Sequence, residues 1–271
     1  MNLCSLLFYP LFINLIRFVE VGMARRIVIT SGKGGVGKTT TAYLLGYNLS
    51  KLGNKVVILD MDIGLNNLDL VAGIDTIVNY DLCDVLEQKC RVRQALIRSE
   101  KNPLLYFLPC VNIANDGKIT TSILQDIIRE LNSEYDYILI DCPAGIGFEF
   151  RRAIFYANEA LVITTPHLIA IRDAGRVCNL LCGCIDNLGL VVNRTKSDFI
   201  AKNLMYTPQE IAKSLHIPLF GIIRENNQVL TLSTTMGGLT GLNDSEMVDW
   251  LDLAKNVAGN KCINAQRFKK L

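Results

Sequence analysis

The sequence predicts an α/β fold, in which an open, mostly parallel and twisted sheet carries helices on both faces. Three observations support this: apolar runs alternate with helical patterns, several runs contain only Val, Ile and Leu before a polar residue, and half of the 271 residues are hydrophobic. Uninterrupted apolar runs are typical of strands that are buried on both faces of a parallel sheet. Alternating strands and helices imply right-handed crossovers, which place helices on both sides of the sheet.

The elements follow one another along the chain without an internal repeat or an obvious linker. Strands are expected at residues 26–31, 55–60, 104–109, 137–141, 160–164, 188–193 and 219–223. Helices are expected at residues 40–52, 119–131, 149–157, 171–181, 207–215 and 245–257. We therefore expect one domain at residues 23–258, preceded by an apolar extension at 1–22 and followed by a short basic amphipathic tail at 259–271.

The extension at residues 1–22 fits no standard leader. Its first 16 residues carry no charge, but Pro10 and Asn14 interrupt them. This stretch is shorter than the ~20 residues that a membrane span needs, and no basic segment precedes it as in a secretory signal. Translation from Met23 is one interpretation, and a segment that touches a membrane is the other.

Charge and cysteine content narrow the classes of function. The formal net charge is only +2, which argues against a broad electrostatic DNA-binding face. The nine cysteines are odd in number and contain no Cys-x-x-Cys pair, which indicates a reducing compartment instead of a disulfide framework.

A glycine-rich loop stands between the first predicted strand and the first predicted helix. It reads SGKGGVGKTT from Ser31 to Thr40 and contains the full Gly-x-x-x-x-Gly-Lys-Thr pattern. Such a P-loop holds phosphates with its backbone N–H groups, with the positive end of the following helix, and with its lysine. We expect Lys38 to reach the β- and γ-phosphates and the Thr39 hydroxyl to ligate Mg²⁺. The remaining phosphate-binding residues are expected to be Gly34, Gly35, Val36, Gly37 and Thr40. The alternative is a glycine-rich turn that binds no nucleotide.

The loop carries a second lysine, Lys33, which an ordinary P-loop does not need. A cation at this place can neutralise phosphate charge, either in the same subunit or in a partner. The alternative is a solvated lysine at the tip of a loop.

Carboxylates follow two of the predicted strands. Asp60 and Asp62 follow one apolar run, and Asp141 follows another. Because ligands bind at the carboxyl ends of strands in open α/β sheets, these side chains are candidates for chemistry. We expect Asp141 to hold Mg²⁺ beside Thr39, Asp62 to position or deprotonate the attacking water, and Asp60 to belong to the metal site. The alternative is that they cap helices.

Asn193 and Arg194 follow a later apolar run. An Asn amide can bond the adenine edge at two places, and an arginine can stack over the base. An asparagine-containing turn is the alternative.

Together these motifs resemble the deviant-Walker-A ATPases, a family of P-loop NTPases whose signature matches residues 33–40. Within that family the chain is most similar to the MinD branch of bacteria and plastids. The stretch at residues 60–70 discriminates this branch, and residues 141–146 and 171–173 add to the match. The resemblance runs from Met23 to about Leu230.

The resemblance implies a Mg·ATP-dependent homodimer that hydrolyses ATP to ADP and phosphate, with Lys33 and Lys38 both taking part in catalysis. Lys33 would contact the phosphates bound by the partner subunit. The dimer would bind the membrane surface through a C-terminal amphipathic helix, respond to a MinE-like activator, carry a division inhibitor of MinC type, and help to place the division septum. Asp173 matches a position that serves partner binding.

Two segments depart from the family pattern. Glu225 is expected to contact the base or ribose, but Arg224 and Asn226 flank it where the family usually has Pro and Asp. The tail ends with Phe268 and Leu271 at i, i+3 among basic residues, which suits weak binding to an anionic membrane. A frayed basic tail is the alternative.

Two other classes compete with this interpretation. A ParA-type DNA-partitioning ATPase would show a basic surface, and such chains usually read Asp-Pro-Gln where this one reads Asp62-Ile63-Gly64. An electron-transfer ATPase similar to the nitrogenase iron protein would need paired cluster cysteines, which we cannot place. The expected partners thus exclude nucleic acid. The expected location is the plastid stroma and the inner envelope surface, or else the bacterial cytoplasm and inner membrane face.

Overall fold

The computed structural model describes residues 24–62, 67–111, 121–233, 235 and 237–263. The predicted extension at 1–22 lies outside the described residues, and so does the tail beyond residue 263. Residues 63–66 of the stretch that discriminates the MinD branch also lie outside them.

Eight strands form one sheet in the order β3-β4-β2-β5-β1-β6-β7-β8. All neighbouring strands are parallel except β3 and β4. The strands are β1 (Arg25–Thr30), β2 (Val56–Asp60), β3 (Ile97–Arg98), β4 (Leu105–Leu108), β5 (Tyr137–Asp141), β6 (Glu159–Thr164), β7 (Asn187–Thr195) and β8 (Leu219–Arg224). All seven predicted strands are confirmed. β3 was not predicted, because its two residues give no periodicity to detect.

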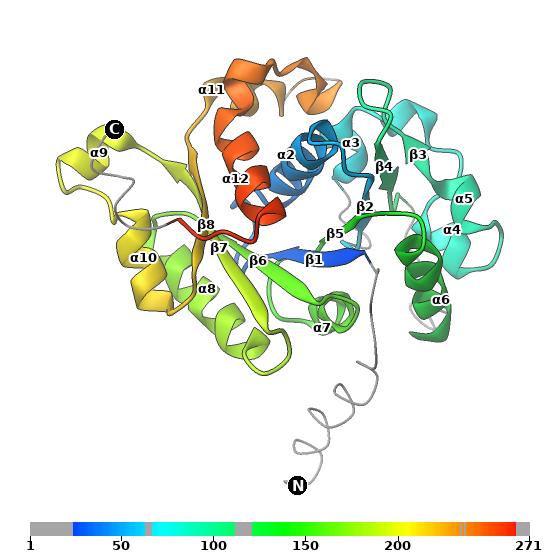
Figure 1. The fold of residues 1–271 in the computed structure, drawn as a ribbon, viewed down its shortest axis with the longest axis horizontal. Helices are drawn as coiled ribbons and strands as arrows, with labels where there is room; N and C mark the ends of the chain where they lie inside the picture. Colours follow the sequence, from blue (N-terminus) through cyan, green and yellow to red (C-terminus); the bar gives the residue numbers. More distant parts are fainter. Residues whose placement is uncertain (1–23, 63–66, 112–120, 234, 236, 264–271) are drawn as a thin grey trace, which may run out of the picture.

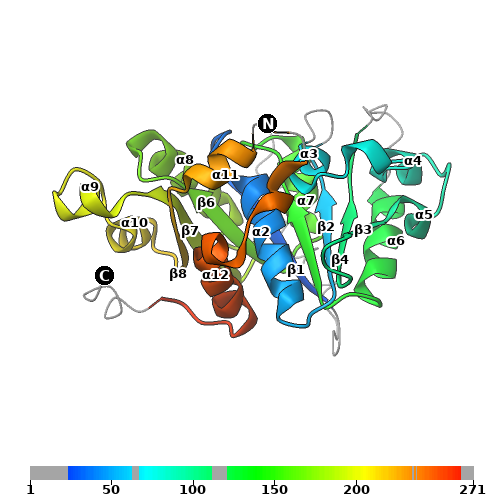
Figure 2. The same ribbon diagram turned by 90° about the horizontal axis from the view of Figure 1, so that it is seen from above.

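Helices cover both faces of this sheet (Figure 1). One face carries α2 (Lys38–Lys51), α11 (Asn227–Leu232) and α12 (Val248–Ala258). The other carries α6 (Thr121–Asn132), α7 (Phe148–Phe155), α8 (Leu168–Leu181) and α10 (Pro208–Leu215). The α/β sheet with helices on both faces is therefore confirmed. Figure 2 shows α2 and α12 side by side on the same face of the sheet, where they pack against each other.

All six longer helices begin within three residues of the prediction. In α10, the Thr207 side chain caps the helix by accepting the Glu210 N–H at 3.2 Å, and Pro208 takes the first turn. The C-terminal helix begins at Val248, three residues late, because 3₁₀ helix η3 (Asp244–Met247) precedes it.

Several short elements were missed, since three to six residues are too few for a helical period. They are α3 (Leu68–Ala72), α4 (Leu82–Leu86), α5 (Val92–Ala95), α9 (Ser197–Ala201) and α11, with 3₁₀ helices η1 (Asp75–Ile77), η2 (Gly238–Gly241) and η3. No helix in the described part of the chain is long and apolar enough to cross a membrane.

The two larger apolar cores lie on opposite faces of the sheet. Successive residues of β1 alternate between them: Val28 packs into the core under α6, α7 and α8, whereas Ile27 and Ile29 pack into the core under α2 and α12. This period of two, with both faces buried, explains why the strands read as continuous apolar runs.

Candidate nucleotide-binding site

The sheet register brings the predicted carboxylates to one edge. β5 lies between β1 and β2, so that Asp141 is level with Ile29 on one side and with Asp60 on the other. Because these strands are parallel, their carboxyl ends lie at the same edge, where the glycine loop leaves β1. The two strand-terminal carboxylates therefore lie next to the loop, as the sequence predicted.

The glycine loop turns through backbone conformations that favour glycine. Gly35 and Gly37 have φ values of +76° and +95°. The Ser31 hydroxyl donates a 2.7 Å hydrogen bond to the Lys33 carbonyl, which closes the loop on itself. A role for Ser31 had not been assigned from the sequence.

Helix α2 begins immediately after the loop. The N–H of Thr41 donates to the Gly37 carbonyl at 2.9 Å, and Gly37 supplies no side-chain cap. The first-turn N–H groups thus point out of the helix together with the positive end of its dipole, which suits an anion such as phosphate.

Lys38 is buried at the start of α2, with only 8% of its surface exposed. Its positive charge lies close to Asp62 and Asp141, where it partly offsets the rise in pKa that burial causes at both carboxyls. Thr39 contributes its side chain as a hydrogen-bond partner of Asp141. The predicted lysine, threonine and carboxylates are therefore brought together.

The carboxylates are held in an unusual environment. Burial, followed by the negative charge of Asp141, raises the pKa of Asp60 well above its ordinary value. Burial also raises the pKa of Asp141 to about 6, although Thr39 and Lys38 act in the opposite direction. The pKa of Asp62 is raised by burial as well, with a smaller contribution from Glu149 on α7. Burial disfavours the charged form of each group unless a cation is added.

Two oxygens of this cluster suit a cation. Asp60 accepts the Asp62 N–H at 2.9 Å through Oδ1, but its Oδ2 is buried without a hydrogen-bond partner among the described residues. The Oδ1 of Asp141 is likewise buried without a hydrogen-bond partner among the described residues. With the Thr39 hydroxyl these oxygens form an all-oxygen donor set, which is what Mg²⁺ prefers. The residues therefore fit a magnesium ion.

Lys33 belongs to the glycine loop and is exposed. Behind the loop, the N–H of Gly145 donates to the Ser31 carbonyl at 3.2 Å, and Gly145 itself has a φ of +92°. The segment after β5 thus touches the glycine loop directly.

The residues predicted to face a base lie farther along the same edge. Asn193 and Arg194 lie within β7 and not after it, because the strand continues to Thr195 through an irregularity in which Arg194 has a φ of +56°. The Asn193 amide donates to the Val36 carbonyl at 2.8 Å, and its oxygen accepts the Arg194 N–H at 2.9 Å. Asn193 therefore supports the glycine loop from the side of β7.

Glu225 follows β8 and is exposed to solvent. Its N–H donates to the Thr195 carbonyl at 3.0 Å, and its carboxylate forms a 2.7 Å ion pair with Lys196. It is connected through β7 to Asn193 and from there to the glycine loop. Arg194 is exposed as well.

Helix α8 also lies in close contact with the glycine loop, at Gly32. A Cβ atom at Gly32 would lie 2.3 Å from the backbone carbon and oxygen of Asp173, so that only glycine fits. Asp173 itself pairs with Arg176 one turn later at 3.2 Å. The sequence had suggested Asp173 for its place in a motif but gave no sign of this contact with the loop.

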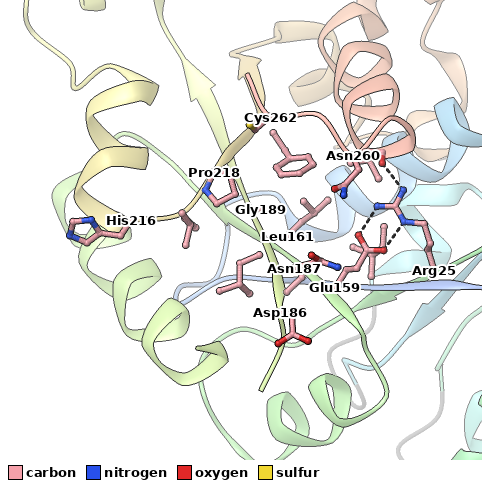
Figure 3. Close-up of a pocket in the computed structure, with 16 residues that line it drawn as sticks. Arg25, Glu159, Leu161, Asp186, Asn187, Gly189, His216, Pro218, Asn260 and Cys262 are labelled. Carbon is pink, nitrogen blue, oxygen red and sulfur yellow. Dashed lines mark hydrogen bonds and ion pairs between the residues drawn. The ribbon is translucent and has the colours of Figure 1, made fainter. Parts of the chain in front are cut away.

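A cavity of about 390 Å³ lies at the amino ends of the strands, away from the candidate site (Figure 3). Its walls include Arg25 and Glu159, which begin β1 and β6 and form a 2.5 Å ion pair. Arg25 also donates to the Val257 carbonyl at 2.6 Å, which ties α12 to the sheet. The cavity contains none of the predicted site residues, so it is separate from the candidate site.

Comparisons with known proteins agree on one group of relatives. Residues 24–188 match a family described as an AAA domain. The chain is 42% identical over 216 residues to the septum site-determining protein MinD of Synechocystis, covering 79% of this chain and 81% of that protein. It is 44% identical over 216 residues to a putative septum site-determining protein MinD of the alga Guillardia theta, covering 79% and 80%.

Solved structures give the same result. A MinC:MinD cell division protein complex from Aquifex aeolicus contains a chain that is 35% identical, with a TM-score of 0.80, covering 89% of this chain and 98% of that one. The septum site-determining protein MinD from Pyrococcus horikoshii, solved with Mg-ADP, is 28% identical with a TM-score of 0.75, covering 92% and 99%. The chain therefore shares its fold with these solved MinD proteins.

Proposed function

The chain belongs to the MinD family of septum site-determining proteins, and we propose that it is an ATPase that hydrolyses ATP to ADP and phosphate with Mg²⁺. The observation that carries this proposal is the cluster at the strand ends, at the start of α2: a buried lysine lies beside two carboxylates, and each carboxylate has a buried oxygen with no hydrogen-bond partner among the described residues. The Mg-ADP complex of the Pyrococcus relative supports the same ligands here.

Each residue has a distinct task in this proposal. The first-turn N–H groups of α2 and the Lys38 ammonium bind the β- and γ-phosphates, while Thr39, Asp141 and Asp60 hold the magnesium ion. Bound there, the ion would offset phosphate charge during hydrolysis. Asp62 orients the attacking water and accepts its proton, for which a raised pKa is an advantage.

We further propose that ATP joins two copies of the chain across this edge. Exposed apolar side chains follow the carboxyl ends of three strands that are near neighbours in the sheet: Leu70 after β2, Ile146 and Phe148 after β5, and Leu168 and Ile169 after β6. Phe148 and Leu168 are 67% and 68% exposed, which is unusual for large apolar residues beside a polar site. A second copy would cover them, and Lys33 would then reach the partner's phosphates.

Membrane binding, partners and location complete the proposal. Residues 262–271 are proposed to bind an anionic membrane surface weakly, so that only the dimer is retained. The MinC:MinD complex of the Aquifex relative supports a MinC-type partner, and a MinE-like activator is proposed by analogy. Cyanobacterial and algal relatives favour a plastid or a bacterial cytoplasm. The ParA-type alternative has less support, because the relatives above 40% identity are septum site-determining proteins.

Two experiments test the switch. ATP hydrolysis and ATP-dependent dimerisation are measured for the intact chain and for Lys38→Ala and Lys33→Ala. Lys38→Ala should lose nucleotide binding, whereas Lys33→Ala should bind Mg·ATP but neither dimerise nor hydrolyse it. Lys51→Ala is the matched control, because Lys51 lies at the other end of α2 and pairs with Asp244. A Lys33→Ala variant that still dimerises would contradict the proposed role of this residue.

Vesicle sedimentation tests the membrane step. The intact chain should sediment with anionic vesicles in ATP but not in ADP or without nucleotide, and removal of residues 262–271 should abolish the effect. Binding that ignores the nucleotide, or that survives the truncation, would count against a membrane switch.

A further inference from the structure

Two cysteines that are distant in sequence meet in the core beside β4. The sulfur of Cys83, on α4, lies 3.1 Å from the sulfur of Cys110, which follows β4, and one thiol donates a hydrogen bond to the other. Both side chains are buried, with 2% and 0% of their surface exposed, and no disulfide joins them. None of the tasks proposed for the nucleotide site uses this pair.

Two hydrogen bonds hold the start of α4 against the chain that leaves β4. The N–H of Leu82 donates to the Pro109 carbonyl at 2.8 Å, and the N–H of Val111 donates to the Asp81 carboxylate at 2.8 Å. These bonds flank Cys110 on both sides, so that the backbone sets the distance between the two thiols. The pair is therefore held in place and does not depend on two flexible side chains meeting by chance.

The surroundings of the pair decide which reagents can reach it. Both thiols belong to the core that Met61, Leu82 and Leu108 help to form. The hydrogen bond with Cys83, and then burial, raise the pKa of the Cys110 thiol, which makes the reactive thiolate scarce. A bulky alkylating reagent or another protein cannot contact sulfurs that are this little exposed. A small, uncharged oxidant can enter where such reagents cannot.

We propose that Cys83 and Cys110 are a modification site, a dithiol that hydrogen peroxide closes to a disulfide, so that α4 is joined covalently to the end of β4. This inference is independent of the proposed ATPase function. From 3.1 Å, the two sulfurs need to approach by about 1 Å to reach the ~2.05 Å of a disulfide. In a reducing compartment, which the cysteine content indicates, the pair remains as thiols, and closure follows only from oxidation.

The reaction balances with one peroxide molecule for each pair. The sulfur of one thiol attacks a peroxide oxygen as its proton leaves, the O–O bond breaks, and the products are a sulfenic acid and water. The sulfur of the second thiol attacks the sulfenic sulfur, the S–S bond forms, the S–O bond breaks, and the hydroxyl leaves with the thiol proton as a second water. Two thiols lose two electrons in all, and the peroxide is reduced. Because the second thiol lies beside the first, closure should be faster than attack by another peroxide molecule.

Closure should also stabilise the fold. The chain between Cys83 and Cys110 contains α5, β3 and β4, and a cross-link across a loop of this size restricts the unfolded chain. Oxidation should therefore lower the equilibrium constant for unfolding in urea by at least about tenfold. A disulfide that strained the folded state would raise this constant instead.

Peptide mapping tests the site in the intact chain. Iodoacetamide first blocks the accessible thiols of the folded protein, because the exposed Cys182 and Cys262 could otherwise form disulfides between molecules. Hydrogen peroxide is then added and removed with catalase, and N-ethylmaleimide blocks the remaining thiols in urea before digestion without reductant. The expected product is a peptide pair that joins Cys83 to Cys110, is lighter than the two reduced peptides by two hydrogens, and separates in dithiothreitol. Urea unfolding compares the oxidised and the reduced chain.

Two variants separate this pair from the other cysteines. Cys110→Ala should form no such link, and its stability should not change with peroxide. Cys178→Ala is the matched control, because it removes another buried thiol of the same core, on α8, and should respond to peroxide as the intact chain does.

The map of the intact chain decides the inference even where a variant does not fold. A linked pair together with a gain in stability supports it. Thiols that survive peroxide, thiols that become sulfinic acids without a link, or links to other cysteines in equal yield would overturn it. A link that leaves the stability unchanged or lowers it would overturn it as well.

Discussion

Asp141→Asn should make the metal-free protein more stable, although it removes a residue that we place at the centre of the site. The pKa of Asp141 is raised from 3.8 to about 6 by burial. A shift of about two units corresponds to ~3 kcal/mol of unfavourable free energy when the buried carboxylate is ionised. Asparagine has nearly the same shape and carries no charge, so most of this energy should be recovered.

The sign of the pH dependence follows from the raised pKa. Because the folded state holds the Asp141 proton more tightly than the unfolded state does, this group favours folding fully below pH 3.8, and the contribution is lost as the pH rises through about 6. The difference in the free energy of unfolding between Asp141→Asn and the intact chain should thus be close to zero near pH 4. It should grow to ~3 kcal/mol at pH 8, with the variant more stable.

Urea unfolding in EDTA at pH 4, 6 and 8 measures this difference. The single tryptophan, Trp250, is buried in α12 and serves as the fluorescence probe. Asp252→Asn is the matched control, since that side chain is 67% exposed and should show no such trend. With Mg·ATP added, the order should reverse, because only the intact chain holds the metal with the Asp141 carboxylate as well as with Asp60. A variant that is less stable than the intact chain in EDTA at pH 8 would refute the reasoning.

Three further predictions concern other parts of the molecule. Gly37→Ala should reduce nucleotide binding at least about tenfold in a filter-binding assay. A Cβ atom there would lie 2.4 Å from the Asn193 amide nitrogen, and the φ of +95° disfavours any side chain. Binding within about twofold of the intact chain would contradict this prediction. Glu159→Gln should lower the free energy of unfolding by about 2 kcal/mol in urea, since it leaves a half-buried arginine without its charge partner, and a loss below about 0.5 kcal/mol would indicate that solvent screens the pair. Iodoacetamide at ~pH 7.5 should label Cys182 and Cys262 first among the eight cysteines that the structure describes, as peptide mapping would show. These two thiols are exposed, whereas the others are partly or fully buried. Labelling of a buried thiol at the same rate would show local opening.

The sequence was sufficient for the elements that have a strong period. The strands are continuous apolar runs because both of their faces are buried, and that pattern is visible without a structure. The glycine loop and Lys38 were predictable for a similar reason, since phosphate binding needs particular residue types at fixed spacing. Short elements such as α3 and β3 were not, because they depend on tertiary contacts and not on local periodicity.

Contacts between loops that are distant in sequence were also beyond prediction. The sequence around Gly32 gives no sign that the backbone of Asp173, about 140 residues later in the chain, lies against it. The same holds for the ion pair between Arg224 and Asp249, because arginine and aspartate on exposed segments are usually solvated. Such contacts depend on how α8 and α12 are placed on the sheet, and that placement is set by the two cores as a whole.

A comparison of Asp81 with Asp141 shows what the structure adds to a residue type. Both side chains are buried, and an aspartate that comes shortly before a helix is often its N-cap. Asp81 is such a cap: it accepts the N–H of Asp84 at 3.0 Å and the N–H of Val111 at 2.8 Å, so that both of its oxygens are used. Asp141 caps nothing, because Gly147 holds the N-cap position of α7, and its Oδ1 is buried without a partner among the described residues. A carboxylate that burial destabilises and no helix uses is best explained by a ligand that is bound during function. The expected reversal of stability on addition of Mg·ATP is therefore the measurement that separates a metal-binding carboxylate from a structural one.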